Sequence, residues 1–296
     1  MRHILVAVAT LLLLAGCGSS SVVAEGGPVS SPYDGPMDLP VDHSDMATVA
    51  ERSGAAGRAL ECDGRPYDGG GADYDSGLAS VQGSAEGALE NLFEQDFLGR
   101  QLPADGYRVE REDNGRVLFS YDVGEQTKIA FVAADSVRDY DDDEGWGVEA
   151  WAQCDPAELP AEVTEALDLE VWEDESGARV PVTKVRSFPG AEHCDWEDIT
   201  FLHLGPERDP DEYLRDPTGE LAELLRTTYD ASAALPDGAT DTGFRRDGRQ
   251  LWLGKRLGNR LGKQLGNRHD AAYLVSVEDP HDVERWPAAK RPIGCA

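Results

Sequence analysis

The stretches "DNGRVLF" (residues 113–119) and "RDGRQLW" (residues 246–252) decide the fold that we expect. Each contains Asn-Gly or Asp-Gly, the strongest short signal of a β-hairpin. Each is followed by an apolar run that is typical of a strand, "KIAFVAA" from Lys128 and "AAYLVSV" from Ala271. Antiparallel hairpins are therefore predicted in both halves of the chain.

Further matches in the same order precede the two hairpins. The stretch "SAEGALENLF" (residues 84–93) aligns without a gap on "DPTGELAELL" (residues 216–225). Both look like helix starts, with a capping side chain followed by apolar residues at i, i+3 and i+4. "LPADG" at Leu102 then matches "LPDGA" at Leu235. This ordered set of matches predicts an internal duplication.

The cysteines frame the two predicted units. Besides Cys17 the chain has four, and an even number in an exported protein predicts two disulfides with three possible pairings. If each unit closes on itself, the bridges are Cys62–Cys154 and Cys194–Cys295. Pairings that exchange partners between the units stay an alternative.

The N-terminus predicts the compartment. An apolar run from Ile4 to Ala15 follows Arg2. It is shorter than the roughly 20 residues of a membrane span and has the length of a signal-peptide core. "LAGC" (residues 14–17) resembles the bacterial lipobox, and this resemblance implies that Cys17 is joined to diacylglycerol and begins the mature chain. We therefore expect a lipid anchor in the bilayer, on the extracytoplasmic face of the cell membrane. An ordinary secretory signal is the alternative.

The expected fold class is α+β, with two tandem duplicated units that each pack a helix on an antiparallel sheet closed by a disulfide. The predicted segments are a lipoprotein signal peptide (1–16), a flexible tether (17–45), a first unit (46–154), a helix-hairpin linker (155–193) and a second unit (194–296). A flexible tether of this length and composition would have a reach of roughly 30 Å.

The net charge of the chain disfavours nucleic acids as partners. The formal net charge is −30, from 57 acidic and 27 basic residues, which disfavours nucleic-acid binding because phosphates are repelled. The most basic stretch, "LGKRLGNRLGKQLGNR" (253–268), repeats a tetrad with a Gly in each copy. We interpret it as a loop insertion within the second unit, because Gly weakens a helix. A membrane-facing or partner-binding helix is the alternative.

Two further stretches invite a chemical reading. In "RDYDDDEGWG" (138–147) the alternate aspartates suggest calcium, but the EF-hand pattern requires Gly and Glu where Glu144 and Ala150 stand. In "CDGRPYDGGGADYDSG" (62–77) the glycines suggest a phosphate loop, but the Lys and Ser/Thr of a P-loop are missing. We expect an acidic loop and a flexible surface loop.

Signatures of catalysis are missing from the sequence, which has no G-x-S-x-G, H-E-x-x-H or C-x-x-C motif. We predict no catalytic residue, no metal ligand and no cofactor.

The chain resembles a set of uncharacterised lipoproteins from high-GC actinobacteria. The resemblance rests on the lipobox and on "GWGVEAWAQCDPAELP", "RRDGRQLW" and "DVERWPAAKRPIGC", and it extends over most of the mature chain. It implies the same compartment, and it implies no mechanism because that family has no assigned activity. The 253–268 run departs from the family and looks like an insertion.

These features together predict a non-catalytic binding or protein-interaction lipoprotein. Its partner would be an envelope protein or a small ligand, and a cleft between two units is a common place for a ligand. The alternatives are an extracytoplasmic hydrolase that uses paired carboxylates and a structural component of the envelope.

Overall fold

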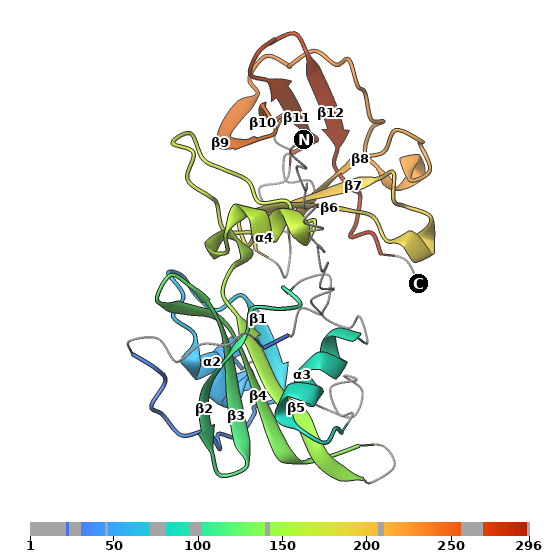
Figure 1. Cartoon of the computed structure of the whole chain (residues 1–296). Helices are drawn as coiled ribbons and strands as arrows, with labels where there is room; N and C mark the ends of the chain where they lie inside the picture. Colours follow the sequence, from blue (N-terminus) through green and yellow to red (C-terminus); the bar gives the residue numbers. More distant parts are fainter. Residues whose placement is uncertain are drawn as a thin grey trace, which may run out of the picture.

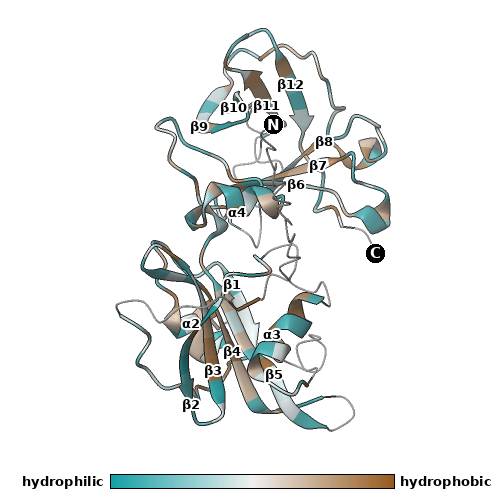
Figure 2. Cartoon of the chain, viewed as in Figure 1, coloured by the Kyte–Doolittle hydropathy of each residue, from teal (hydrophilic) through white to brown (hydrophobic). Residues whose placement is uncertain are grey.

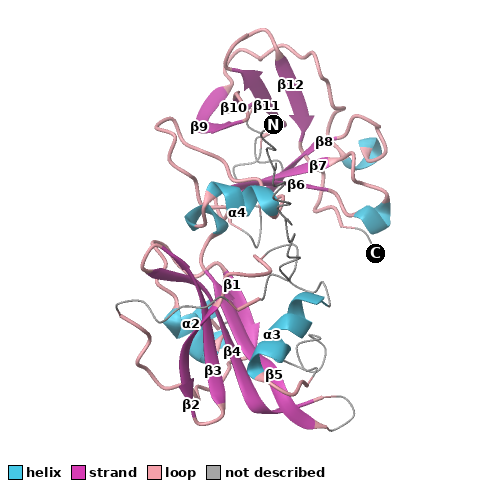
Figure 3. Cartoon of the chain, in the orientation of Figure 1, coloured by secondary structure: helices cyan, strands magenta, loops and turns pink. Residues whose placement is uncertain are grey.

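The computed structural model describes residues 22–23, 31–44, 47–71, 81–94, 102–139, 143–206, 210–255 and 269–294. Strands predominate in it, with 39% of the described residues in strands and 15% in helices (Figure 3). The chain is therefore a mixed protein that is mostly β, with antiparallel sheets and few helices.

The first part of the molecule is a five-stranded antiparallel sheet with the order β1-β5-β4-β3-β2. Its elements are α1 (Val49–Arg52), α2 (Gly54–Ala59), β1 (Asp68–Gly71), α3 (Ala85–Glu94), β2 (Arg108–Asp113), β3 (Arg116–Val123), β4 (Gln126–Arg138) and β5 (Glu144–Gln153). The predicted hairpin between β2 and β3 is confirmed. Asn114 and Gly115 form its turn with φ angles of 50° and 74°, which is the left-handed conformation that this dipeptide favours.

The central strands are buried on both faces, which explains their long apolar runs. Successive side chains point to opposite faces of a sheet. Large side chains such as Phe119, Phe131 and Trp151 pack toward α3, whereas alanines such as Ala130 and Ala152 pack toward α2. Because α2 has the sequence "GAAGRA", it presents little bulk to this face. Figure 1 shows the two helices on opposite sides of the sheet, and Figure 2 shows the hydrophobic strands between them.

Part of the segment expected to be a flexible tether packs on the first part. Met37 is buried in the core on the α2 side. Closer to the N-terminus, Val23 forms a parallel bridge with Tyr107, and the backbone N–H of Tyr107 donates to the carbonyl of Val22 at 3.2 Å. The described residues 22–23 and 31–44 are thus attached to the folded protein, while residues 17–21 and 24–30 lie outside the described residues.

The second part contains two antiparallel sheets, β6-β7-β8 and β12-β11-β10-β9, with a shared core. Its elements are β6 (Val185–Pro189), η2 (Glu192–Cys194), β7 (Thr200–Leu204), β8 (Asp211–Arg215), η3 (Ala222–Leu224), β9 (Thr240–Arg246), β10 (Arg249–Leu253), β11 (Ala271–Ser276) and β12 (Val283–Pro287). Leu202 and Tyr213 of the first sheet pack with Leu251 and Trp286 of the second around the buried Trp172. The β9–β10 hairpin confirms the prediction at Asp247-Gly248.

Two short elements, η1 (Pro156–Glu158) and α4 (Ala161–Ala166), join the parts. The helix predicted in the linker is therefore present. The boundary predicted at residue 194 falls inside the sheet β6-β7-β8. The disulfide Cys62–Cys154 is confirmed, with Cα atoms 5.3 Å apart. It closes the first part just before η1.

The prediction of two tandem units, each a helix packed on a sheet, is wrong. The helix α3 forms where we expected it, but the matching residues 216–225 contain only the 3₁₀ turn η3. The carboxylate of Asp216 accepts from the backbone N–H groups of Gly219 at 2.8 Å and Leu221 at 2.9 Å. Gly219 has a φ of 76°, which a right-handed helix does not allow. A local turn therefore replaces the second helix.

The Gly-rich stretch was predicted to be a flexible loop, but its residues 68–71 form the edge strand β1, and residues 72–77 lie outside the described residues. A Cβ atom on Gly69 would lie 2.6 Å from the carbonyl oxygen of Trp151 and 2.5 Å from Ser53 Oγ. The glycine thus permits the close approach of β1 to β5. Of the predicted basic insertion (residues 253–268), residues 256–268 lie outside the described residues. No helix within the described ranges is long and apolar enough to cross a membrane.

Candidate functional site

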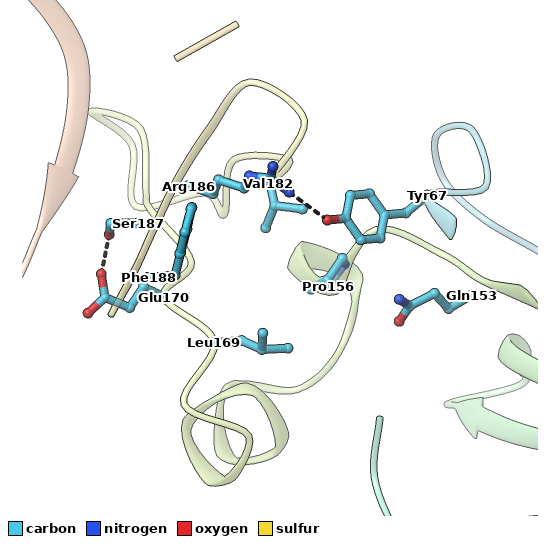
Figure 4. Close-up of a pocket in the computed structure, with 9 residues that line it drawn as sticks. All are labelled: Tyr67, Gln153, Pro156, Leu169, Glu170, Val182, Arg186, Ser187 and Phe188. Carbon is cyan, nitrogen blue, oxygen red and sulfur yellow. Dashed lines mark hydrogen bonds between the residues drawn. The ribbon is translucent and has the colours of Figure 1, made fainter. Parts of the chain in front are cut away.

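A cavity of about 320 Å³ lies where the two parts meet (Figure 4). This size falls at the lower end of the range of small-molecule sites. Both parts and the connection between them contribute side chains. The lining residues are Tyr67, Gln153, Pro156, Leu169, Glu170, Val182, Arg186, Ser187 and Phe188.

Gln153 is the last residue of β5, and its backbone is fixed in the sheet. It pairs with Ile129 of β4 and Asp68 of β1, and its carbonyl accepts from the N–H of Tyr67 at 2.9 Å. Its side chain is 1% exposed. Neither amide atom, Oε1 or Nε2, has a hydrogen-bond partner among the described residues. Figure 4 shows the amide end directed toward Pro156 and Leu169, so the unpaired group points toward the cavity, although less than 1 Å² of either atom is accessible.

Arg186 lines the cavity and contacts polar residues of both parts. Its Nη1 donates to the hydroxyl of Tyr67 at 3.0 Å, and its Nη2 lies 3.4 Å from Nδ1 of His203. A guanidinium only donates, so Nδ1 must accept. The other ring nitrogen, Nε2, therefore carries the proton and donates to Glu212 at 2.9 Å. The guanidinium also lies 5.6 Å from the ring centre of Phe188.

Glu170 is the carboxylate among the nine lining residues, and it is already bound. It accepts from the hydroxyl of Ser187 and forms an ion pair with Arg246. Ser187 also accepts from Nε1 of the buried Trp172 at 3.1 Å. This network holds Glu170 against the second part.

The apolar wall consists of Pro156, Leu169, Val182 and the ring of Phe188. Asp155 positions it, because Oδ1 accepts from the N–H of Val182 at 3.0 Å. The cavity is thus mostly apolar with a few oriented polar groups, the usual composition of a small-ligand site.

Arg179 links the residues around α4 to the segment that leads into β6. It donates to the carbonyl of Leu159 and to the hydroxyl of Thr164, both at 2.8 Å. Burial lowers the pKa of its guanidinium, although nearby carboxylates such as Glu173 oppose the shift. An arginine remains charged at any physiological pH even so, and the contact ties residues 159–164 to the second part.

None of the residues that we predicted as site residues is among the nine that line the cavity. Cys62 and Cys154 form their bridge as expected. Cys194 lies at the end of η2, and its predicted partner Cys295 lies outside the described residues, as does Cys17. The anchor and the second bridge therefore stay predictions.

The described residues contain one geometric group of metal-ligand types, Cys62, Cys154 and Glu158. Both sulfurs belong to the disulfide, and Glu158 pairs with Lys128 at 2.8 Å, so this group is not a metal site. In the predicted acidic loop, Asp139 and Asp143 bond to each other's backbone, and residues 140–142 lie outside the described residues.

Sequence reasoning missed the residues that form the cavity. Gln153 carried the one available signal, because it is a polar residue two positions after Trp151 in a strand that is otherwise buried there. No sequence signal marked Tyr67 and Arg186, because 119 residues separate them along the chain.

Comparison with known proteins gives no further information on this site. No protein-family model, no curated protein and no solved structure matches the chain.

Proposed function

We propose that the chain is a small-ligand-binding lipoprotein, held by Cys17 on the extracytoplasmic face of the cell membrane. The anchor rests on the lipobox alone. The binding role rests chiefly on one observation, the cavity between the two parts with the buried amide of Gln153 pointing toward it, unpaired among the described residues. Buried polar groups are normally paired, so a bound molecule could supply the partner that this amide lacks among the described residues.

The geometry favours binding over the paired-carboxylate hydrolase. Glycoside hydrolysis uses two carboxyl groups roughly 5–9.5 Å apart. The lining contributes one carboxylate, Glu170, whose Oε2 contacts both Ser187 and Arg246. The cavity residues therefore give that alternative no support.

A ligand screen with a cavity-filling variant tests the proposal. Leu169 lines the cavity and is half-buried, so Leu169→Trp should fill the space with little effect on folding. We expect compounds that raise the Tm of the full chain in detergent to lose their effect on this variant. Binding at [L] = 100 Kd adds about 2.7 kcal/mol of stability.

Leu167→Trp is the matched control, because Leu167 is equally half-buried and does not line the cavity. Compounds should act on this variant as they do on the unmodified chain. Ligands that stabilise Leu169→Trp as strongly as the unmodified chain would place binding elsewhere and refute the proposal.

A further inference from the structure

Gln153 is the feature that indicates what kind of molecule the cavity would hold. A glutamine amide offers a carbonyl acceptor and an N–H donor side by side. Both atoms are buried, and neither is paired within the described residues. Leaving such a group buried and unpaired is unfavourable, and replacing it with an apolar residue of similar shape would be an easy remedy. The amide is therefore explained best by a partner that occupies the cavity.

The charged groups of the lining are engaged with other residues of the protein. Arg186 donates to Tyr67 and contacts His203. Glu170 is held by Ser187 and Arg246. Recognition by charge would have to compete with these contacts, whereas the amide of Gln153 has both of its polar atoms to offer.

On the basis of the proposed function, we infer that the cavity binds a small uncharged molecule with an apolar body and an amide-type edge. Primary amides and lactams have such an edge, with an N–H donor beside a carbonyl acceptor. Because both amide atoms of Gln153 have less than 1 Å² of accessible surface in this structure, the lining must open slightly for a ligand to reach them. The ligand N–H would then donate to Oε1 of Gln153, and the ligand carbonyl would accept from Nε2. Paired bonds of this kind resemble the way in which glutamine reads the edge of adenine.

The rest of the cavity suits such a molecule. Figure 4 shows Pro156 and Leu169 on the side toward which the amide end of Gln153 points, and Val182 and Phe188 add further apolar surface. The apolar body would contact these side chains. Because they exclude water, hydrogen bonds at this end would be stronger than bonds exposed to solvent. A molecule with the same shape but no N–H would leave Oε1 unpaired.

Three probes of similar shape test the inference by NMR titration of the full chain in detergent. Benzamide has both a donor and an acceptor, acetophenone has the acceptor alone, and benzoate is charged. We expect benzamide to bind about tenfold more tightly than acetophenone, as one additional buried hydrogen bond permits. Gln153→Met should abolish this difference, and the exposed control Gln126→Met should preserve it.

The unliganded stability provides a second readout. Removal of an unpaired amide should leave the Tm of Gln153→Met equal to that of the unmodified chain or raise it by about 3 °C. A lowered Tm would mean that the amide is already paired and would overturn the inference. If Gln153→Met does not fold, Gln153→Leu also removes both the donor and the acceptor and should likewise lose the preference for benzamide.

The remaining outcomes separate this inference from the proposed function. Equal binding of benzamide and acetophenone would overturn the amide preference and leave the binding function intact. The same holds for a benzoate preference that survives Gln153→Met, which would assign recognition to Arg186. If none of the probes binds and a wider screen finds no ligand, both proposals fail together.

Discussion

At the residue scale, Tyr107 and Gln153 present the same physical situation in different surroundings. Both are almost fully buried, and both have polar side-chain atoms without a partner among the described residues. The ring of Tyr107 is enclosed by Phe93, Tyr121 and Phe131, with centroids 5.3–5.7 Å away. Gln153 instead faces a cavity. Burial of the Tyr107 hydroxyl is therefore an unfavourable consequence of packing a large ring in the core. The Gln153 amide, in contrast, can still acquire a partner in the cavity.

The Tyr107 hydroxyl predicts a dependence of stability on alkaline pH. Burial is the main cause that raises its pKa well above the ordinary value of 10. The neutral form is thus favoured by folding, and this stability is complete below pH 10 and falls as pH rises toward the folded pKa. Tyr107→Phe should reduce the alkaline loss of unfolding free energy by about 1.4 kcal/mol per pH unit.

Urea unfolding of both proteins between pH 7 and pH 11 measures this effect. The two should be nearly equally stable at pH 7, because the lost hydroxyl has no hydrogen-bond partner in the part of the chain that the structure describes. Parallel curves above pH 10 would show that Tyr107 ionises freely in the folded state, contrary to the prediction.

The functional residues could hardly have been predicted individually. Cysteines are recognisable by type, and an even number of them in a chain predicted to be exported indicates disulfides, so Cys62–Cys154 was accessible from the sequence. Gln153 becomes notable only when its burial is known. Tyr67 and Arg186 are ordinary polar residues whose contact depends on the packing of the first part against the second.

At the element scale, Lys128 and Glu158 hold the corner of the first part beside the disulfide. Lys128 is buried within β4, and its Nζ contacts Glu158 and the carbonyl of Glu61 at 2.8 and 2.9 Å. Glu158 also accepts from the N–H groups of Asp63 and Gly64. The single carboxylate thus joins β4, η1 and the loop after Cys62.

Removal of one partner should destabilise the fold strongly, because the other charge stays buried without its counter-ion. We expect Glu158→Ala to lower the unfolding free energy by about 3–5 kcal/mol, measured by urea titration. The double variant Lys128→Met/Glu158→Leu should recover most of this loss.

Glu149→Ala is the comparison, because its pair with Arg116 is more exposed and should contribute about 0–1 kcal/mol. Similar losses for Glu158→Ala and Glu149→Ala would contradict a special role of the corner.

The elements that the sequence predicted well are those specified by local chemistry. The turns at Asn114-Gly115 and Asp247-Gly248 were recognisable because few other dipeptides favour two left-handed residues in succession. The apparent second helix at residues 216–225 failed because Gly219 and the carboxylate of Asp216 stabilise a turn. The strand β1 was missed because its glycines resemble a loop, and only contact with β5 makes them necessary.

At the scale of the whole molecule, the connection between the parts also forms the cavity. Asp155 caps η1 through the N–H of Ala157 at 2.9 Å, and the same oxygen accepts from Val182. Val182 and Pro156 then line the cavity on either side of this contact. A ligand that touches Gln153 and Val182 would bridge the two parts and should restrict their relative motion.

The proposed membrane anchor concerns the whole chain, and it is testable by fractionation. If Cys17 carries the lipid, Cys17→Ser should remove metabolic labelling by a palmitate analogue and release the protein from the membrane fraction, because acyl chains supply the binding energy. Ser21→Ala is the control and should stay labelled and bound. Retention of label in Cys17→Ser would show that another residue is modified.

The bridge between Val23 and Tyr107 gives such an anchor an unexpected geometry. Only six residue steps separate Cys17 from Val23, so a fully extended chain would span about 20 Å. The folded first part would then stay close above the lipid headgroups, with the edge near β2 directed downward. The protein would diffuse within a thin layer at the membrane surface, so its encounters with ligand would be nearly two-dimensional. Molecules that collect in that layer would meet it far more often than molecules in the bulk.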